Sequence, residues 1–430
     1  MKKLYSITLA IVIMLTCILS ACGQSKEIEA DTTESVSSIS LLNIKSEVAT
    51  QMEALAQQYE KETGIKVNIM TIQSGVDAQA TLKGYYLSDQ MPDIIACESS
   101  GFGNWEGLLV DMSDQDWASR TDAAYKDSTY GTLGFPYTTE AIGLAYNKDI
   151  LTKAGVDPAS ITGPDAMRKA FEAIDAKKDQ LGLKAVIGYA AEPENLGWSA
   201  GNHLTGAYID SGLARSDTTY IDMMSNGGGV DENRLTHYAE MIGLFNEYSD
   251  PDLLVSGTYD DQVAGFAAGK YAFVTQGSWI GATLSGSDDY AKAGSFEVGM
   301  TPYAFEEGMD TILTSAPNWW AVPKEGQVEA ALAFLQWCSE DSAQQILVEQ
   351  AGFASPFVDC KYVASDPFAP VIASYISAGK TSSWHWMEMA EGLGQKGLSF
   401  VYQKFAKGEL DVSGFVNEFK KVASDWYSKL

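Results

Sequence analysis

Strand-like and helix-like patterns alternate regularly along the first part of the chain, and this alternation constrains the fold more than any other feature. In chain order, the alternating strand-like and helical segments occupy residues 39–44, 48–63, 65–69, 78–87 and 92–96. The order β-α-β-α-β predicts a largely parallel α/β sheet covered by helices. Ligands of such sheets gather at the carboxyl ends of the strands. The loops after Ile44 and Ala96 are therefore the first places to search for a binding site.

The N-terminus has the features of a secretory signal with a lipidation site. Lys2 and Lys3 precede an apolar run that ends in Leu19-Ser20-Ala21-Cys22. Cleavage after residues 1–21 would leave Cys22 as an acylated first residue. The alternative is a permanent N-terminal membrane anchor, but the apolar run is short for a span of roughly 20 residues. Residues 22–38 are polar and are predicted to form a flexible tether.

Charge and composition argue against several classes of function. The formal net charge of the chain is −28, and removal of the signal makes it −30, which repels nucleic acid and anionic lipid. Apart from Cys17 of the signal and the acylated Cys22, the three remaining cysteines have no metal-like spacing. The three histidines are isolated, with no H-E-x-x-H motif. We therefore predict no nucleic-acid partner, no bound metal and no cofactor.

One glycine pattern has to be weighed as a dinucleotide site. Gly392, Gly394 and Gly397 match G-x-G-x-x-G, but the motif requires a strand before it and a helix after it. Here it follows a helix-like segment, so we do not assign it to a nucleotide.

The aromatic content is high, with ten tryptophans and 21 tyrosines. Several tryptophans lie in loops flanked by glycine or serine. They are Trp198, Trp279, Trp319, Trp320, Trp384 and Trp386. An indole can stack on the weakly polar C–H face of a sugar ring, while carboxylates and amides bind its hydroxyl groups. For any one of these residues, partial burial at a lobe surface is an equally good interpretation.

Taken together, these features resemble the extracellular solute-binding proteins of ABC importers, in particular the sugar-binding group that includes maltose-binding protein. Residues 91–95 and the loop after them are similar to the Pro-Asp-Ile strand of that family, and residues 136–151 to its first crossover between lobes. The segment 266–279 is similar to the part whose tryptophan stacks on the ligand. The Asp-Arg pair of maltose-type proteins is missing, which leaves the identity of the sugar open.

The resemblance implies an α/β, two-lobe periplasmic-binding-protein-like fold of type II, with a ligand cleft between the lobes. It places crossing strands near residues 137–142, 300–307 and 353–360. One lobe is expected to comprise residues 39–138 plus 306–354. The other is expected to comprise residues 139–305 plus 355–430.

The expected function is capture of a carbohydrate, with an oligosaccharide favoured, and its delivery to an ABC transporter permease by a monomer that performs no chemistry. The candidate ligand-binding residues are Glu47, Glu98, Ser99, Glu140, Trp198, Trp279, Trp319 and Trp384. The protein is expected at the extracellular face of the cytoplasmic membrane, anchored through lipid at Cys22.

Two alternative functions remain open from the sequence. Acidic loops combined with tryptophans also suit a polyamine or another cationic solute, through cation–π contacts. A lipid-anchored glycoside hydrolase would use Glu98 and Glu140 as acid and base, although sequence cannot show the separation that such a pair needs.

Overall fold

The computed structural model describes residues 36–73 and 75–430. The expected signal peptide, Cys22 and most of the tether lie outside the described residues. Strand β1 (Ser38–Asn43) begins at Ser38, the last residue of the expected tether. Among the described residues, no helix has the length and apolar character needed to cross a membrane.

The first lobe begins with the alternation expected from the sequence. It contains β1, α1 (Ala49–Thr63), β2 (Lys66–Thr71), α2 (Ala78–Leu87) and β3 (Ile95–Cys97). Strands β1 and β2 pair in parallel, and Leu41 forms a parallel bridge with Ile94 at the start of β3. Helix α1 ends at Gly64, whose φ of 78° is a left-handed conformation that glycine adopts without strain. The β-α-β-α-β order and the parallel arrangement of these three strands are confirmed, whereas the other strand pairs of this lobe are antiparallel.

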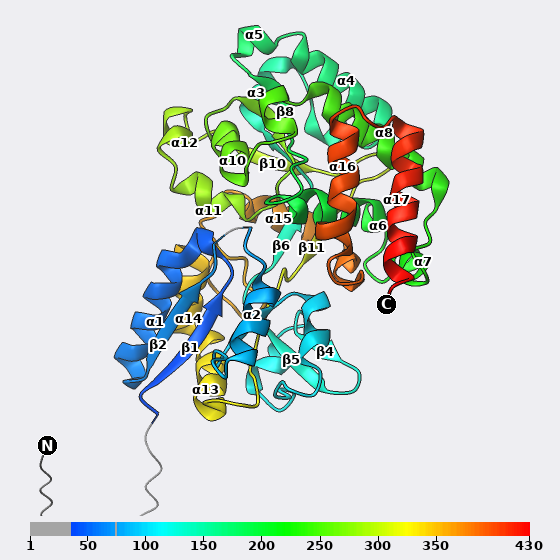
Figure 1. Ribbon diagram of the computed structural model, residues 1–430. Coiled ribbons are helices and arrows are strands. Elements are labelled where there is room, and N and C mark those ends of the chain that lie inside the picture. The colour runs from blue at the N-terminus through cyan, green and yellow to red at the C-terminus, as the bar shows by residue number, and fades with distance from the viewer. Residues whose placement is uncertain (1–35, 74) are drawn as a thin grey trace, which may run out of the picture. The chain divides into compact units, whose positions relative to one another are not determined.

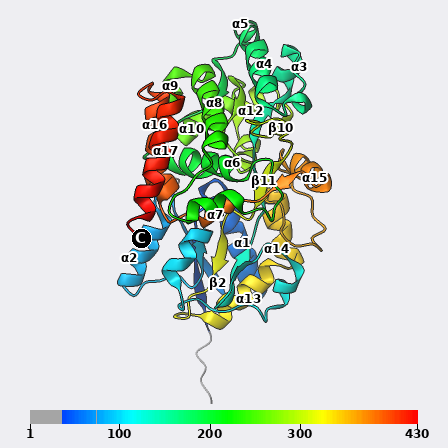
Figure 2. The same cartoon turned by 90° about the vertical axis from the view of Figure 1, so that its right-hand side faces the viewer.

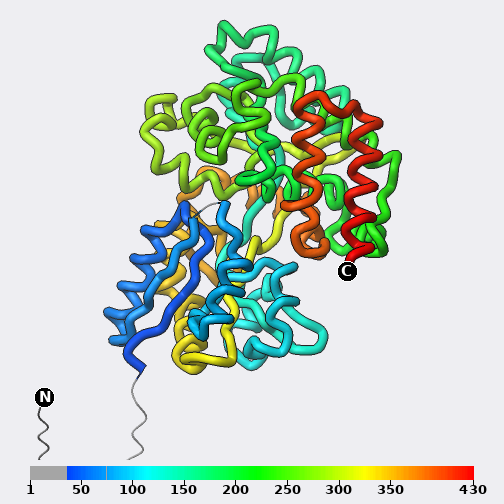
Figure 3. Tube along the Cα trace, viewed as in Figure 1, coloured from blue at the N-terminus to red at the C-terminus, as the bar shows by residue number. Residues whose placement is uncertain are grey.

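The chain leaves this lobe and later returns to it. A second sheet of the first lobe has the order β3-β12-β5-β4, in which β12 (Trp319–Ala321) pairs antiparallel with β3 and with β5 (Gly131–Pro136), and β5 pairs with β4 (Tyr125–Asp127). Helices α13 (Val328–Cys338) and α14 (Asp341–Gln345) follow β12 and pack near α1 (Figures 1 and 3). The first lobe is therefore discontinuous in sequence.

The second lobe is built on a sheet of order β10-β7-β9-β8. Its strands are β7 (Leu144–Asn147), β8 (Ala185–Gly188), β9 (Tyr271–Val274) and β10 (Val298–Thr301). The larger helices of this lobe are α4 (Pro164–Asp175), α8 (Glu232–Tyr248), α10 (Tyr259–Ala267), α16 (Ser399–Ala406) and α17 (Val412–Tyr427). They lie around the sheet in Figures 1 and 2, with the C-terminal α16 and α17 against α8.

In the described part of the chain, the second lobe also contains eight smaller helices. They are α3 (Lys148–Ala154), α5 (Lys178–Leu181), α6 (Thr205–Asp210), α7 (Thr219–Ser225), α9 (Pro251–Leu254), α11 (Ile280–Ser285), α12 (Asp288–Lys292) and α15 (Ala369–Ser377). Helix α11 contacts the 3₁₀ turn η1 (Ser46–Val48), which follows β1 of the first lobe.

A small three-stranded sheet lies where the two lobes meet. It consists of β6 (Glu140–Ile142), β11 (Ile312–Ser315) and β13 (Thr381–Ser382), and a bridge from Thr139 to Ala354 adds a further connection. The return strand is β11, later than the expected 300–307, because Phe305 packs edge-on against Tyr238 of α8. Glu306 also pairs with Arg234 of the same helix at 2.8 Å. The exact lobe boundaries stay a prediction.

Candidate functional site

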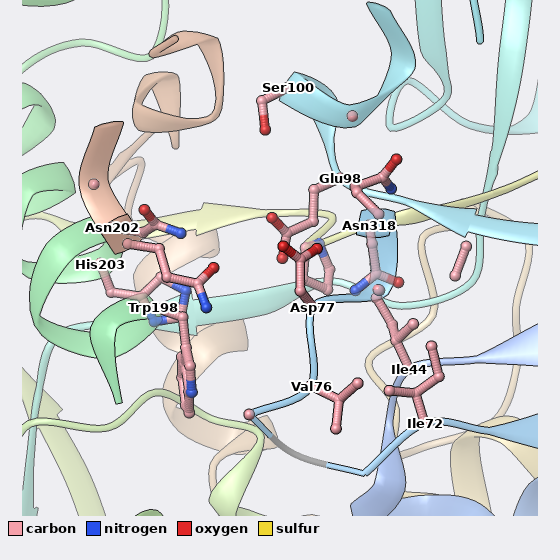
Figure 4. A pocket seen from close by; sticks show the side chains of 18 of the residues that line it. Ile44, Ile72, Val76, Asp77, Glu98, Ser100, Trp198, Asn202, His203 and Asn318 are labelled. Atoms are coloured by element: carbon pink, nitrogen blue, oxygen red, sulfur yellow. The ribbon is translucent and has the colours of Figure 1, made fainter. Parts of the chain in front are cut away.

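A cavity of about 250 Å³ lies between the lobes and is lined by side chains from both. The first lobe contributes the loop after β1, the segment that leads into α2, and the turn after β3. The second lobe contributes the π-helix η5 (Trp198–Leu204), the loop after β9, and the segments around η7 (His385–Glu388) and η8 (Leu393–Leu398). In Figure 4, Asp77 and Glu98 face Asn202 and His203 across this space.

A buried ion pair forms part of the cavity wall near the crossing strands. Asn43, the last residue of β1, fixes the following turn by accepting a hydrogen bond from the backbone N–H of Lys45 at 3.0 Å. This turn directs the Lys45 ammonium to Glu140 of β6, with Glu47 at 3.5 Å. Lys45 is 6% exposed and Glu140 is 5% exposed. Since each charge would be unfavourable here alone, the pair holds the loop and the strand together.

The pKa values around this pair reflect burial and mutual attraction. Burial lowers the pKa of Lys45, but the attraction of Glu140 and Glu47 outweighs burial and leaves the pKa raised. Burial raises the pKa of Glu140, and Lys45 opposes that rise. Lys45 therefore stays charged, and its ammonium group is already paired with Glu140 and Glu47.

Glu98 presents a carboxyl group to the cavity. It follows β3, and its side chain points into the space between the lobes (Figure 4). Among the described residues, no side-chain hydrogen bond or ion pair involves this carboxyl group. Burial raises the pKa of Glu98 to about 7, with Lys45 acting in the opposite direction. Its group is thus available to a ligand.

The second-lobe wall is aromatic. Trp198, Trp279, Trp384 and Trp386 all line the cavity, and their rings surround His203. The ring centroid of His203 lies 4.8 Å from that of Trp279 and 5.1 Å from that of Trp386. Burial lowers the pKa of His203 to about 3, so its ring is neutral at physiological pH.

Hydrogen bonds hold the two partly exposed indoles in place. The Trp279 indole N–H donates to the side-chain oxygen of Gln276 at 3.0 Å, and Gln276 in turn donates to Gln262 at 2.8 Å. The Trp198 indole N–H donates to the backbone oxygen of Asn195 at 3.1 Å. With their polar edges occupied, these indoles offer apolar faces to a ligand.

Comparison with known proteins identifies the family. A model of the bacterial extracellular solute-binding proteins matches residues 54–369, well over half of the chain. This chain belongs to the bacterial extracellular solute-binding proteins. The solute-binding protein is 25% identical over 240 residues to the sn-glycerol-3-phosphate-binding periplasmic protein UgpB of Agrobacterium fabrum, a match that covers 54% of this chain. It spans about half the length of that relative, with 50% covered.

Solved structures establish the two-lobe fold for this solute-binding protein. RafE in complex with raffinose is 19% identical with a TM-score of 0.71, and a chitin oligosaccharide binding protein is 16% identical with a TM-score of 0.76. Each match covers 91% of this chain and 99% of the other. The predicted type II architecture and family are confirmed.

The cavity brings together six of the eight residues expected to bind ligand. Those that line it are Glu47, Glu98, Glu140, Trp198, Trp279 and Trp384. Ser99 is not among the lining residues, although its neighbours Glu98 and Ser100 are. Trp386 lines the cavity together with Trp384, so both members of that pair face it. Their roles in binding stay predictions.

Trp319 lies in the core of the first lobe and does not line the cavity, contrary to the sequence-based expectation. It sits in β12, is 6% exposed, and packs against Phe102 and Tyr125. Its indole N–H donates to the backbone oxygen of Ala123 at 2.6 Å. Packing accounts for its large side chain, and we leave it out of the proposed site.

Several lining residues were not among the expected ones. Lys45, Asp77, Asn202, His203, Tyr259 and Asn318 belong to this group. Asn202 and His203 follow Trp198 within η5. The polar residues after this loop tryptophan were the sequence feature that could have indicated them as lining residues. Nothing in the sequence indicated that Lys45 pairs with Glu140, 95 positions further along the chain.

Proposed function

We propose that this solute-binding protein captures a neutral carbohydrate and delivers it to the permease of an ABC importer. The observation that carries the proposal is the division of the cavity into two walls. Four indoles lie on the second-lobe side, and four of the five lining carboxylates lie on the first lobe and the crossing strand β6. A pyranose has matching faces, because its C–H groups pack on aromatic rings and its hydroxyls donate to carboxylates.

The charge of the lining argues against a phosphate ester, the kind of solute named for UgpB. Among the described residues, the cavity lining includes no arginine. Its two lysines, Lys45 and Lys396, are already paired with carboxylates. A phosphate would face Glu98 without a free cation or fork-shaped guanidinium to bind it. A neutral solute avoids this repulsion.

Hinge closure is the proposed mechanism. The ligand contacts both lobes at once, so the closed form gains contacts that the open form lacks, and the permease recognises the closed form. Catalysis is not part of the proposal. In a hydrolase Glu140 would have to exchange protons with substrate, whereas here it is paired with Lys45.

The proposal includes lipid anchoring of a monomer at Cys22, on the extracellular face of the cytoplasmic membrane. Its support is the order of charged, apolar and small residues before that cysteine. We expect Cys22→Ser to abolish incorporation of labelled palmitate and to release the protein from the membrane fraction. Unchanged labelling in this variant would refute the anchoring proposal.

Calorimetry on a panel of solutes tests the carbohydrate proposal. Neutral oligosaccharides, including raffinose and chitin oligosaccharides, are compared with spermidine and with glycerol-3-phosphate. We expect heat only from a saccharide. Trp279→Ala should weaken saccharide binding at least tenfold, about 1.4 kcal/mol. Trp337→Ala is the matched control, because Trp337 packs on Tyr59 away from the cavity. Equal saccharide affinity of the Trp279 variant and the wild type would refute the proposal.

A cationic solute is the second candidate, and one observation favours it. Five carboxylates and two lysines line the cavity, so carboxylates are in excess among the described lining residues. The Glu98 carboxyl group has no partner in the part of the chain that the structure describes, and the indoles offer faces for cation–π contact with an ammonium group. Heat from spermidine with none from any saccharide would establish this candidate in place of the first.

A further inference from the structure

Three side-chain contacts join the lobes at one end of the cavity. Asp77 pairs with Lys396 at 2.5 Å, Lys83 pairs with Glu391 at 3.4 Å, and Asn104 donates to Glu391 at 3.1 Å. Asp77, Lys83 and Asn104 belong to the first lobe, whereas the other two residues flank and enter η8 of the second. The two ion pairs have opposite polarity across the boundary, which fixes the register of the two surfaces.

The first-lobe side of this contact is held by a helix cap. One carboxylate oxygen of Asp77 accepts a hydrogen bond from the backbone N–H of Ala80 at 2.9 Å and caps α2, and the other binds Lys396. Burial raises the pKa of Asp77, but the bonds from Lys396 and Ala80 outweigh burial and leave the pKa lowered. Asp77 therefore stays ionised and already points across the boundary.

The second-lobe side is positioned by the glycine motif that was not assigned to a nucleotide. Gly392 has a φ of 78° where η8 begins. A Cβ on Gly394 would lie 2.1 Å from the Asn202 side-chain oxygen and 2.7 Å from the Gly201 backbone oxygen. Only glycine permits this close approach of η8 to η5. The motif brings Glu391 and Lys396 to the edge of the aromatic wall.

We propose that these contacts form a gate, made of Asp77, Lys83, Asn104, Glu391 and Lys396, that joins the lobes and closes one end of the cavity. Three gate residues, Asp77, Glu391 and Lys396, also line the cavity, so the gate forms part of the cavity wall. On the proposed carbohydrate function, closure of this end of the cavity favours a short saccharide, because the volume of about 250 Å³ is below the usual range of about 300–1,000 Å³ for ligand pockets.

The gate acts before the solute arrives, since its contacts are between protein groups. All four charged side chains are partly exposed, between 35% and 57%. An exposed pair of this kind shifts an equilibrium by up to about fivefold. Two pairs and a hydrogen bond therefore maintain a measurable closed population without holding the lobes permanently.

Single-molecule FRET on the full chain in detergent, without any solute, tests the gate. Fluorophores are attached through unnatural amino acids at the exposed Glu60 of α1 and Glu240 of α8. We expect a high-efficiency population in the wild type. Glu391→Lys should lower the closed-to-open ratio at least threefold, and Lys83→Glu combined with Glu391→Lys should restore it to within about twofold.

Two further variants separate the gate from general charge effects. Asp77→Asn keeps a side chain that caps α2 but removes the charge, and should lower the ratio by about two- to fivefold. Asp425→Lys breaks the Lys421–Asp425 pair within α17 and should leave it unchanged. The gate is refuted if the wild type shows no closed population, if both gate variants match the wild type, or if the α17 control changes the ratio equally.

The preference for a short saccharide is tested by calorimetry with matched disaccharides and tetrasaccharides of glucose and of N-acetylglucosamine. We expect a disaccharide to bind the wild type more tightly than its tetrasaccharide, and Glu391→Lys to narrow that difference. A tetrasaccharide bound by the wild type as tightly as its disaccharide would overturn this preference. If no saccharide binds while the FRET results hold, the carbohydrate function fails and the gate stands.

Discussion

Replacement of Lys45 by methionine is the most informative perturbation of the cavity wall. Methionine has a similar length and no charge, so it fills the space while leaving Glu140 buried without its partner. Glu140 is 5% exposed, and Glu47 lies 3.5 Å from the position of the lost ammonium. The variant therefore concentrates carboxylates in a poorly hydrated place. We expect a large loss of stability at neutral pH.

The size of this loss follows from the geometry. At 3.5 Å and an effective dielectric constant of about 20, the attraction between Lys45 and Glu47 alone is about 5 kcal/mol, before the cost of burying the ammonium is subtracted. Removal of one partner of a buried pair generally costs about 3–5 kcal/mol. We expect Lys45→Met to lower the free energy of unfolding by that amount at pH 8.

The loss should depend on pH in a defined direction. Without Lys45, the already raised pKa of Glu140 rises further. A carboxyl with a raised folded-state pKa contributes stability below its unfolded pKa and loses that stability as pH rises through the folded value. The deficit of Lys45→Met relative to the wild type should therefore shrink to about 1 kcal/mol or less near pH 5.

Equilibrium urea unfolding at pH 5 and pH 8 measures both effects. The double variant Lys45→Met with Glu140→Gln removes both charges and should recover stability to within about 2 kcal/mol of the wild type at pH 8. A single variant that unfolds within 1 kcal/mol of the wild type at pH 8, or a deficit that is identical at both pH values, would refute this account of the pair.

Three other changes test separate parts of the structure. Glu98→Gln should stabilise the ligand-free protein by about 1–3 kcal/mol at pH 8 and by little near pH 5, because the wild type loses stability as pH rises through the Glu98 pKa of about 7; urea unfolding across this range checks it. Trp319→Ala should lower stability by about 3–5 kcal/mol, while Trp319→Phe keeps saccharide affinity within about twofold in calorimetry. Trp279→Ala should do the reverse, with weakened binding and a nearly unchanged urea midpoint.

The order of elements in the first lobe was predictable because it depends on local periodicity. Alternating apolar residues and helical spacing placed β1, α1, β2, α2 and β3 close to their observed bounds. The return crossing was placed too early, because the pattern after β10 does not reveal that Phe305 packs on Tyr238. Contacts between residues far apart in the sequence decide where the chain crosses between lobes. Local periodicity gives no information about such contacts.

The site was predictable only in part for a similar reason. Trp279 and Trp198 each follow glycine or serine in a predicted loop, and both line the cavity. Trp319 also follows loop-forming residues, namely proline and asparagine, yet it lies in a strand. Tyr125 and Phe102 pack against its ring. The surroundings of His203 come from segments near 198, 279 and 385. No local pattern records that these segments converge.

Glu98 and the gate act in opposite directions on closure of an empty cavity. Closing the lobes withdraws water from the unpaired Glu98 carboxyl, which costs free energy unless that group is protonated or accepts a hydrogen bond. The gate contacts between α2 and η8 favour closure at the other end. A solute that donates a hydroxyl to Glu98 removes the opposing contribution, so its differential affinity for the closed form adds to a bias already present. A solute without such a donor would leave the carboxyl unpaired, and closure would gain no stabilisation at Glu98.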